Sequence, residues 1–356
     1  MKKIITIVGA RPQFVKAAVV SRAIATDGRM REIIVHTGQH FDANMSEVFF
    51  TEMAIPMPHY NLNISSLSHG AMTGRMLEKI EEVLLQEKPD LVLVYGDTNS
   101  TLAGALAAKK LHIKVAHVEA GLRSFNMDMP EEINRILTDR ISDLLFCPTD
   151  TAIRNLEREG FDNIDCRIIE NGDVMQDAAL FYATKAKKPD FNIPAHFALC
   201  TAHRAENTDD PNRLQAIFTA LEKISEKYPV VLPLHPRTKA KLSDIHYDFT
   251  HTKIHFINPV GYLEMVYLLK NCQFVLTDSG GLQKEAYFFR KNCVTLRDET
   301  EWIELITNGF NILAGANTET ILEAADEMAV KKNDFSVHLY GNGNAGEIIV
   351  QNLASL

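Results

Sequence analysis

The stretch that decides the fold is Tyr95–Arg140, which reads YGDTNSTLAGALAAKKLHIKVAHVEAGLRSFNMDMPEEINRILTDR. Two short apolar segments, Leu91–Val94 just before it and Ile113–Val118 within it, each end abruptly in polar residues. The acidic residues at these two ends are Asp97 and Glu119. In α/β proteins, ligands bind where the carboxyl ends of neighbouring parallel strands meet. The stretch therefore predicts a parallel sheet with a ligand site at its strand ends.

The alternation of strand and helix continues along the whole chain. Near-continuous apolar strands that alternate with amphipathic helices are typical of parallel sheets covered on both faces. The expected strands are 4–8, 32–36, 91–95, 115–118, 144–147, 167–169, 197–200, 230–234, 254–257, 274–276 and 294–296, with helices at 74–86, 98–110 and 345–353. The segment 185–194, KAKKPDFNIP, is the best linker candidate. The sequence therefore predicts two doubly wound α/β domains that face each other across a cleft.

Length, charge and cysteine content narrow the class of protein. A chain of 356 residues suits two domains of about 150–180 residues each. A net charge of −9 argues against a nucleic-acid or anionic-membrane partner, and no apolar segment approaches the ~18–20 residues that span a bilayer. The five cysteines are odd in number and contain no CxxC pair, which favours buried thiols in a reducing cytoplasm over disulfides or metal ligation.

The first strand leads into GARPQFVKA, a candidate anion site. Gly9 permits a tight turn, Pro12 suits the first helical position, and Arg11 and Lys16 bring positive charge near a helix N-terminus. The segment is neither a Walker A loop nor a GxGxxG motif, so an ordinary strand-to-helix turn with surface cations is an equal alternative. His40 follows the second strand, in HTGQHFD. It either binds sugar hydroxyls or lies in a turn without a binding role.

The acidic residues have structural alternatives to a catalytic role. Asp97 precedes the helix 98–110 and is a plausible N-cap. Glu131 opens another helix, where it favours the macrodipole and is spaced for an i,i+4 pair with Arg135. Strand alternation puts Glu119 and His117 on one side of their strand end. An H-x-E pair can begin a metal site, but no clear set of further ligands follows, so we expect no metal.

Their grouping favours the functional interpretation. Three acidic sites lie at neighbouring loop positions, with Arg123 and Arg135 nearby. Such a group can hold one carboxyl protonated and another ionised, which is what an acid/base pair requires.

The second half places cations and glycines at its own strand ends. TAHRAEN contains His203, HPRT contains His235 and Arg237, and NPVGY contains Tyr262. The segment TDSGGLQKEAYF at 277–288 is the most specific, because Gly280 and Gly281 expose backbone N–H groups at a helix N-terminus that suits a diphosphate. Glu285, one turn into that helix, can accept two ribose hydroxyls. A Gly-rich packing turn is the alternative.

These segments together resemble a known family. GARPQFVKA, TGQHFD, YGDTNST, HVEAGLRS, PEEINR, TAHRAEN, HPRT, TDSGG-x-QKEA and RDETEW occur in order, and over essentially its whole length the chain resembles the non-hydrolysing UDP-N-acetylglucosamine 2-epimerases. The resemblance implies the glycosyltransferase-B fold, with two Rossmann-like domains. It implies a first domain of 1–172 plus 340–356, which carries the catalytic acids and a C-terminal helix that crosses back, and a UDP-binding domain of 173–339.

The resemblance also implies a chemistry. Such an enzyme removes the proton on sugar carbon 2, expels UDP to leave a 2-acetamidoglucal, and adds UDP back while carbon 2 is reprotonated from the other face. It needs no cofactor, acts as a cytoplasmic homodimer on a UDP-sugar, and serves surface polysaccharide synthesis. The implied catalytic residues are Asp97, Glu119, Glu131 and His203. The implied substrate-binding residues are Arg11, Lys16, His40, Arg123, Arg135, His235, Arg237, Tyr262, Ser279, Gly280, Gly281 and Glu285.

One segment departs from the commoner members of the family. Those acting on plain UDP-N-acetylglucosamine usually carry an Arg and an acidic residue where this chain has 41–44, FDAN. GARPQF and SFNMDMPEE are most similar to the branch acting on UDP-2,3-diacetamido-2,3-dideoxy-glucuronate, whose carboxylate would want a cation such as Arg75 or Arg123. A hydrolysing epimerase that releases UDP, a UDP-sugar glycosyltransferase on the same fold and a non-catalytic UDP-sugar binder remain alternatives.

Overall fold

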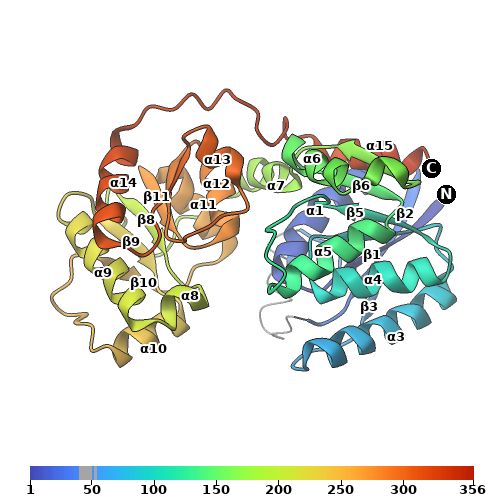
Figure 1. The fold of residues 1–356 in the computed structure, drawn as a ribbon, viewed down its shortest axis with the longest axis horizontal. Helices are drawn as coiled ribbons and strands as arrows, with labels where there is room; N and C mark the ends of the chain where they lie inside the picture. Colours follow the sequence, from blue (N-terminus) through green and yellow to red (C-terminus); the bar gives the residue numbers. More distant parts are fainter. Residues whose placement is uncertain (40–49, 52–53) are drawn as a thin grey trace. The chain divides into compact units, whose positions relative to one another are not determined.

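The computed structural model describes residues 1–39, 50–51 and 54–356. The chain divides into two compact units, Met1–Ala178 with Leu339–Leu356, and Ala179–His338. Each unit is a parallel sheet between helices (Figure 1). The chain passes from the first unit to the second within α7 (Val174–Ala183). The segment 185–194, predicted as a linker, lies inside the second unit.

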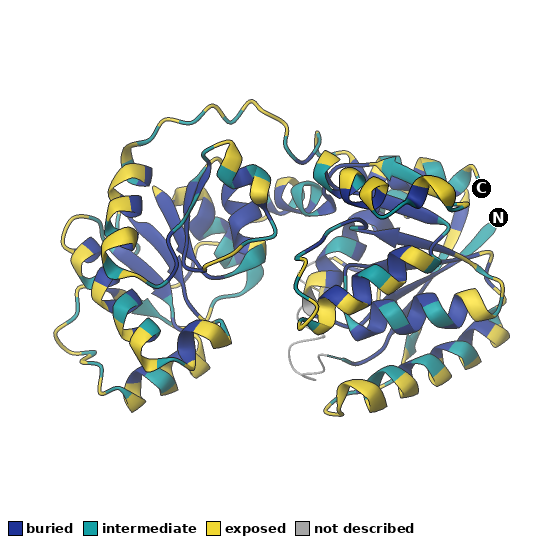
Figure 2. Cartoon of the chain, in the orientation of Figure 1, coloured by how far each residue is buried: buried dark blue, intermediate teal, exposed yellow. Residues whose placement is uncertain are grey.

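The described residues of the first unit form a seven-stranded sheet in the order β3-β2-β1-β4-β5-β6-β7, and every neighbouring pair is parallel. Its strands are β1 Lys2–Val8, β2 Met30–His36, β3 Tyr60–Asn61, β4 Leu91–Tyr95, β5 Lys114–Val118, β6 Leu144–Cys147 and β7 Arg167–Glu170. Its helices are α1 Arg11–Asp27, α3 His69–Glu87, α4 Asn99–Lys110, α5 Pro130–Ile141, α6 Asp150–Arg158, the 3-10 turn η1 Phe161–Asn163, and α15 Ala345–Ala354. The strands between the two edges, β3 and β7, are mostly buried, while the helices turn an exposed face outward (Figure 2), as expected for a sheet covered on both sides.

The second unit contains a six-stranded parallel sheet in the order β10-β9-β8-β11-β12-β13. Its strands are β8 Ala198–Thr201, β9 Val230–Pro233, β10 His255–Ile257, β11 Phe274–Thr277, β12 Asn292–Thr295 and β13 Asn311–Leu313. Its helices are α8 Ala205–Thr208, α9 Pro211–Ser225, α10 Pro236–Asp244, α11 Tyr262–Asn271, α12 Gly280–Phe288, α13 Ile303–Thr307 and α14 Thr318–Val330. The α/β prediction of two doubly wound sheets is confirmed.

The strand order of each sheet reverses at one point, and the loops that follow the two strands on either side of that point carry predicted site residues. In the first unit the order reverses between β1 and β4, and in the second between β8 and β11. Crevices for ligands in open α/β sheets form outside the carboxyl ends of the strands at such points. The topology thus directs attention to the loops after these four strands.

The final helix, α15, packs on the first unit beside α1. The carboxylate of Asp177 accepts hydrogen bonds from the backbone nitrogens of Ala345 (3.2 Å) and Gly346 (3.0 Å) at the start of α15. A Cβ on Gly346 would lie 2.8 Å from a methyl group of Val19, so glycine allows the close approach. Along the described part of the chain, no helix is both long and apolar enough to cross a membrane.

Candidate active site

The loop after β1 is held tightly against its neighbours. A Cβ on Gly9 would lie 2.1 Å from the hydroxyl of Ser100 and 2.2 Å from that of Thr37, so this position requires glycine. The Oε1 atom of Gln13 accepts from the backbone nitrogen of Gly9 (2.8 Å), and its Nε2 donates to the carbonyl of Tyr95 at the end of β4 (2.7 Å). This one amide therefore ties the first turn of α1 to the loop that follows β4.

Lys16, on the next turn of α1, forms an ion pair with Glu119. The two side chains are 12% and 9% exposed, so the pair is largely withdrawn from water. β5 ends at Val118, and Glu119 has a left-handed φ of 74°. The strand alternation used to predict the direction of Glu119 therefore does not apply to it. Other non-glycine residues of the described chain also have positive φ, among them Lys88 at the end of α3, so this conformation alone does not mark a functional site.

Asp97 does not cap α4. The N-cap is Thr98, whose hydroxyl accepts from the backbone nitrogen of Thr101 (3.3 Å), so the capping alternative for Asp97 is wrong. Asp97 instead forms an ion pair with Arg135 of α5. Burial acts to lower the pKa of Arg135, but the charges of Asp97, Glu132 and Glu119 outweigh it and raise this pKa above its usual value. The guanidinium is thus the common partner of several acids.

The two glutamates at the start of α5 have different environments. Glu132 is buried, accepts from the backbone nitrogens of Ser124 and Phe125 (2.9 Å each), and pairs with Arg135 at 2.9 Å. Glu131 is exposed in the first turn of the helix. The helical partner of Arg135 is therefore Glu132, at i,i+3, in place of the expected Glu131. Glu132 holds the loop in place, while Glu131 is accessible from solvent.

A buried network lies behind these acids. Nδ1 of His117 is 2.7 Å from Oδ1 of Asp139, and its Nε2 is 2.7 Å from the carbonyl oxygen of Gly96, next to Asp97. The other oxygen of Asp139 accepts from Nη1 of Arg123 (2.7 Å). Burial acts to raise the pKa of Asp139, but His117 and Arg123 outweigh it and hold this pKa below its usual value.

Arg123 belongs to this network. Its side chain is 1% exposed, and its Nε and Nη2 donate to the carboxylate of Glu159 at 2.7 and 2.8 Å. Its Nη1 also donates to the carbonyl of Leu122 (2.7 Å). This placement argues against the predicted contact of Arg123 with substrate, including a sugar carboxylate, because its donors are directed into the protein.

The loops after β8 and β11 lie side by side in the second unit. The strands pair Thr201 with Thr277 in register, so His203 and Ser279 follow at matching positions. The His203 side chain is 41% exposed, and its ring centroid lies 5.9 Å from that of His235. His235 is the N-cap of α10, where its Nδ1 accepts from the backbone nitrogen of Arg237 (3.2 Å).

The N-terminus of α12 has the features of an anion site. Ser279 is its N-cap, and the positions after it are glycines. A Cβ on Gly280 would lie 3.6 Å from Nη2 of Arg204, 3.6 Å from Oε2 of Glu301 and 3.9 Å from Nη1 of Arg297, whereas a Cβ on Gly281 would have nothing within 4 Å. Backbone N–H groups, the helix dipole and two guanidinium groups, one of which is paired with the Glu301 carboxylate, therefore coincide, which favours a bound anion. Gly280 and Gly281 were predicted here from the sequence.

Arg297 is not among the site residues predicted from the sequence, where RDETEW serves only as one of the motifs that carry the resemblance. Its side chain is 4% exposed and pairs with Glu301 at 3.1 Å. The available signal was an arginine and a glutamate close together in the loop directly after an apolar strand, where the structure pairs them.

Further along α12, Glu285 is buried. Burial, followed by the charge of Glu285, raises the pKa of Tyr262 well above its usual value, so these two predicted residues lie close together. Arg237 is turned the other way, toward Asp209, with which it forms an exposed ion pair. The guanidinium of Arg237, one of the residues predicted for the second unit, is therefore already paired with a carboxylate at the protein surface.

Some predictions fall outside what the structure describes. His40 and the segment 41–44 lie outside the described residues, as does the side chain of Arg11. Across the described ranges, no group of three or more His, Cys, Asp or Glu side chains is arranged to hold a metal ion.

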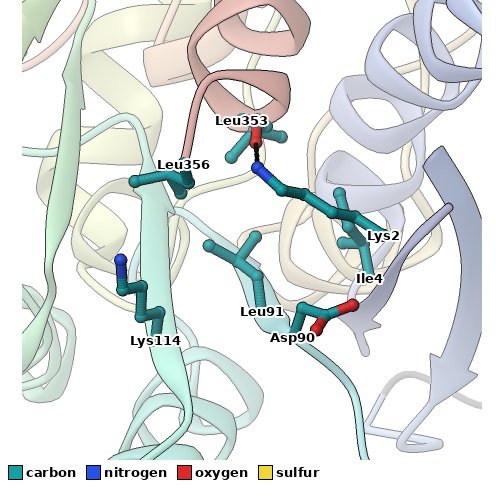
Figure 3. A pocket seen from close by; sticks show the side chains of 7 residues that line it. All are labelled: Lys2, Ile4, Asp90, Leu91, Lys114, Leu353 and Leu356. Atoms are coloured by element: carbon teal, nitrogen blue, oxygen red, sulfur yellow. Dashed lines mark hydrogen bonds between the residues drawn. The ribbon is translucent and has the colours of Figure 1, made fainter. Parts of the chain in front are cut away.

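Two cavities are lined by other residues. One, of about 230 Å³, is lined by residues at the opposite, amino-terminal edge of the first sheet together with the end of the chain (Figure 3). Its lining residues are Lys2, Ile4, Asp90, Leu91, Lys114, Leu353 and Leu356. The other, of about 750 Å³, lies where β9 and β10 end, and its walls include Leu234, Ile257 and Phe191. Neither cavity is lined by a predicted site residue.

Two doubly wound parallel units, one with clustered acids and one with an anion site at a helix N-terminus, define an α/β protein of the glycosyltransferase-B type. The sequence profile of the family described as UDP-N-acetylglucosamine 2-epimerase matches residues 22–354. The chain therefore belongs to the UDP-N-acetylglucosamine 2-epimerase family and is an isomerase, which confirms the resemblance seen in its motifs.

Individual relatives agree with this assignment. The chain is 58% identical to the UDP-2,3-diacetamido-2,3-dideoxy-D-glucuronate 2-epimerase of Pseudomonas aeruginosa, over 99% of this chain and 100% of that protein. It is 46% identical to a UDP-N-acetylglucosamine 2-epimerase of Methanocaldococcus jannaschii, over 98% of each. The crystal structure of the M. jannaschii UDP-GlcNAc 2-epimerase in complex with UDP-GlcNAc and UDP is similar, with a TM-score of 0.89 and 45% identity over 100% of both chains.

Proposed function

We propose that the protein is a non-hydrolysing 2-epimerase of a UDP-2-acetamido sugar. The preferred substrate in this proposal is UDP-2,3-diacetamido-2,3-dideoxy-D-glucuronate, with UDP-N-acetylglucosamine as the second candidate. The observation that carries the choice is the 58% identity to the P. aeruginosa enzyme across 99% of the chain, against 46% to the M. jannaschii enzyme.

The proposed reaction is an elimination followed by an addition. A base removes the proton on carbon 2, its electron pair forms the C1=C2 double bond, and the bond from C1 to the UDP oxygen breaks. The same oxygen then attacks C1 while carbon 2 takes a proton on its opposite face. Two proton-transfer groups are needed, one for each face, and Asp97, Glu119 and Glu131 are the proposed candidates. We assign no face to any of them.

The proton on carbon 2, the carbon that carries the acetamido group, is only weakly acidic. Elimination therefore requires that the negative charge that develops on the departing UDP be stabilised. Preorganised donors aimed at developing charge supply the largest part of such stabilisation. We assign the diphosphate to the N-terminus of α12, supported by the two glycines of its first turn, Gly280 and Gly281, and by the adjacent guanidinium of Arg204. Glu285 is the proposed anchor of the ribose. Lys16, already paired with Glu119, is proposed to offset phosphate charge.

One NMR experiment tests the proposal. The protein is incubated in D₂O with each sugar nucleotide in turn, and we expect inversion at carbon 2 with deuterium entering there in substrate and product, without accumulation of UDP. Free sugar with stoichiometric UDP would instead identify a hydrolysing epimerase, and transfer to an added acceptor a glycosyltransferase. Absence of exchange with both sugars would refute the proposal.

A matched pair of variants locates the chemistry. Glu119→Gln removes a proposed proton-transfer group, and we expect exchange to slow by about 10²- to 10⁴-fold. Glu157→Gln makes the same chemical change at an exposed position of α6 and should leave the rate unchanged. Equal rates for the two variants would remove Glu119 from the mechanism.

We further propose that the enzyme is a cytoplasmic homodimer that supplies a surface polysaccharide precursor. Exposed apolar side chains gather in the first unit, with Phe125 at 69%, Met127 at 59%, Ile133 at 40% and Leu137 at 46% exposure. Exposed apolar groups of this kind often mark protein interfaces. Light scattering on the purified protein should give twice the chain mass, and a monomer would contradict the dimer.

A further inference from the structure

One buried carboxylate joins the loops after β8 and β11. Asp278 follows the last residue of β11 and is 0% exposed. Its Oδ2 accepts hydrogen bonds from the backbone nitrogens of His203 (2.8 Å) and Arg204 (2.9 Å), and from Nδ2 of Asn207 (3.3 Å). β8 and β11 are neighbours at the point where the strand order reverses, and Asp278 immediately precedes Ser279, the N-cap of α12 at the candidate anion site.

The other oxygen of Asp278 is not used in the same way. Oδ1 is buried and accepts no hydrogen bond from any described residue, and it lies 3.5 Å from Nδ1 of His203. A buried acceptor without a donor is costly. The distance exceeds that of a good hydrogen bond, but such contacts are often long in unliganded enzymes and tighten in the complex. A proton on Nδ1 of His203 would supply a donor directed at Oδ1 of Asp278.

The groups around His203 shift its pKa in opposite directions. Burial lowers the pKa of His203, the Asp278 carboxylate raises it, and His235 and Arg204 lower it, with a net pKa below the usual value. Asp278 is therefore the group that stabilises the protonated ring. His235 already uses its Nδ1 as an acceptor from Arg237, so it carries its own proton on Nε2 when neutral.

We propose that Asp278 is the positioning residue of His203, holding a proton on Nδ1 and leaving Nε2 as the ring nitrogen available to the ligand. The proposal rests on the function assigned above only for the identity of that ligand, the diphosphate of a UDP-sugar. When His203 is protonated, its Nε2–H donates to a phosphate oxygen as the bond to the sugar breaks. A purely structural Asp278 would need only Oδ2, because this oxygen accepts the three hydrogen bonds that join the carboxylate to residues after β8.

The variant Asp278→Asn separates the two roles. Its amide oxygen can take the place of Oδ2 and accept from the same backbone nitrogens, while its Nδ2 then presents a donor toward Nδ1 of His203. We expect the neutral ring to change from the Nδ1–H to the Nε2–H tautomer and to become protonated only at lower pH. Both are read from ¹⁵N shifts of labelled histidine in the protein without substrate, with His203 assigned by the signal missing from His203→Gln.

Thr201→Val is the matched control, because it removes a buried 2.6 Å hydroxyl contact between Thr201 and Thr277 on the same two strands. It should lower the melting temperature without altering the tautomer. An unchanged tautomer and titration midpoint in Asp278→Asn would overturn the proposal, as would an equal change in Thr201→Val. If Asp278→Asn fails to fold, an Nε2–H tautomer in the wild-type protein is sufficient to overturn it.

Epimerisation provides the second readout. We expect Asp278→Asn to lower kcat by about 10²-fold, with a smaller effect on KM and a displaced pH profile. A protein with the expected tautomer but no epimerase activity would retain the positioning role and refute the proposed function. An active epimerase whose His203 tautomer does not change in Asp278→Asn would retain the proposed function and refute the positioning role.

Discussion

Asp139→Asn is expected to destabilise the protein strongly. The Asp139 carboxylate is completely buried and is shared by His117 and Arg123, both at 2.7 Å, and by the backbone nitrogen of Gly121 at 3.1 Å. An uncharged amide leaves the Arg123 cation short of its compensating charge in a side chain that is 1% exposed. Removing one partner of a buried pair costs about 3–5 kcal/mol. We expect a loss of that size in the free energy of unfolding at pH 7, measured by urea denaturation with circular dichroism.

Glu159→Gln is the control, since Glu159 is the other carboxylate bound to Arg123 but its side chain is 33% exposed. Solvent screening should limit its cost to about 1 kcal/mol or less. A loss below 1 kcal/mol for Asp139→Asn, or equal losses for the two variants, would refute the reasoning from burial.

The pH dependence of this stabilisation follows from the sign of the shift. The pKa of Asp139 is lower in the folded protein than its usual value, because His117 and Arg123 favour the carboxylate over the opposing effect of burial. The stabilisation is therefore present above the unfolded-state pKa and is lost as pH falls through the folded-state pKa. The difference between wild type and Asp139→Asn should consequently shrink in acid.

Three further predictions concern the loops of the site. Gly9→Ala places a Cβ 2.1 Å from the Ser100 hydroxyl and should cost about 1–3 kcal/mol in thermal unfolding, whereas Gly70→Ala, with nothing within 4 Å, should gain up to about 1 kcal/mol. Lys16→Met should weaken UDP binding about tenfold by calorimetry, as loss of one charged contact is worth roughly 1.4 kcal/mol, and an unchanged Kd would exclude its phosphate contact. Glu301→Gln frees the charge of Arg297 and should tighten UDP binding by about three- to tenfold at low salt, with the gain fading as salt rises; no gain would exclude Arg297 from the anion site.

The strands could be predicted because burial on both faces leaves a direct mark in the sequence. Leu144–Cys147 was predicted with the bounds that the structure has, and Leu91–Tyr95 is buried at every position. Two edge strands were missed, Tyr60–Asn61 and Asn311–Leu313. They have two and three residues, which is too few for an apolar run to stand out from a loop.

The partners of the charged side chains could not be predicted, because local spacing offers several and tertiary structure selects one. Spacing favoured Glu131 for Arg135, but the fold turns Glu132 inward and brings Asp97 to the same guanidinium. In the same way, Arg123 was grouped with the acids by its position in the chain, yet its donors are directed into the interior. Residue type and strand-end position thus locate a charged site, while the direction of each side chain depends on which buried charge it must neutralise. His203 shows the same dependence, since the carboxylate beside it belongs to Asp278, which follows β11 and lies 75 residues further along the chain.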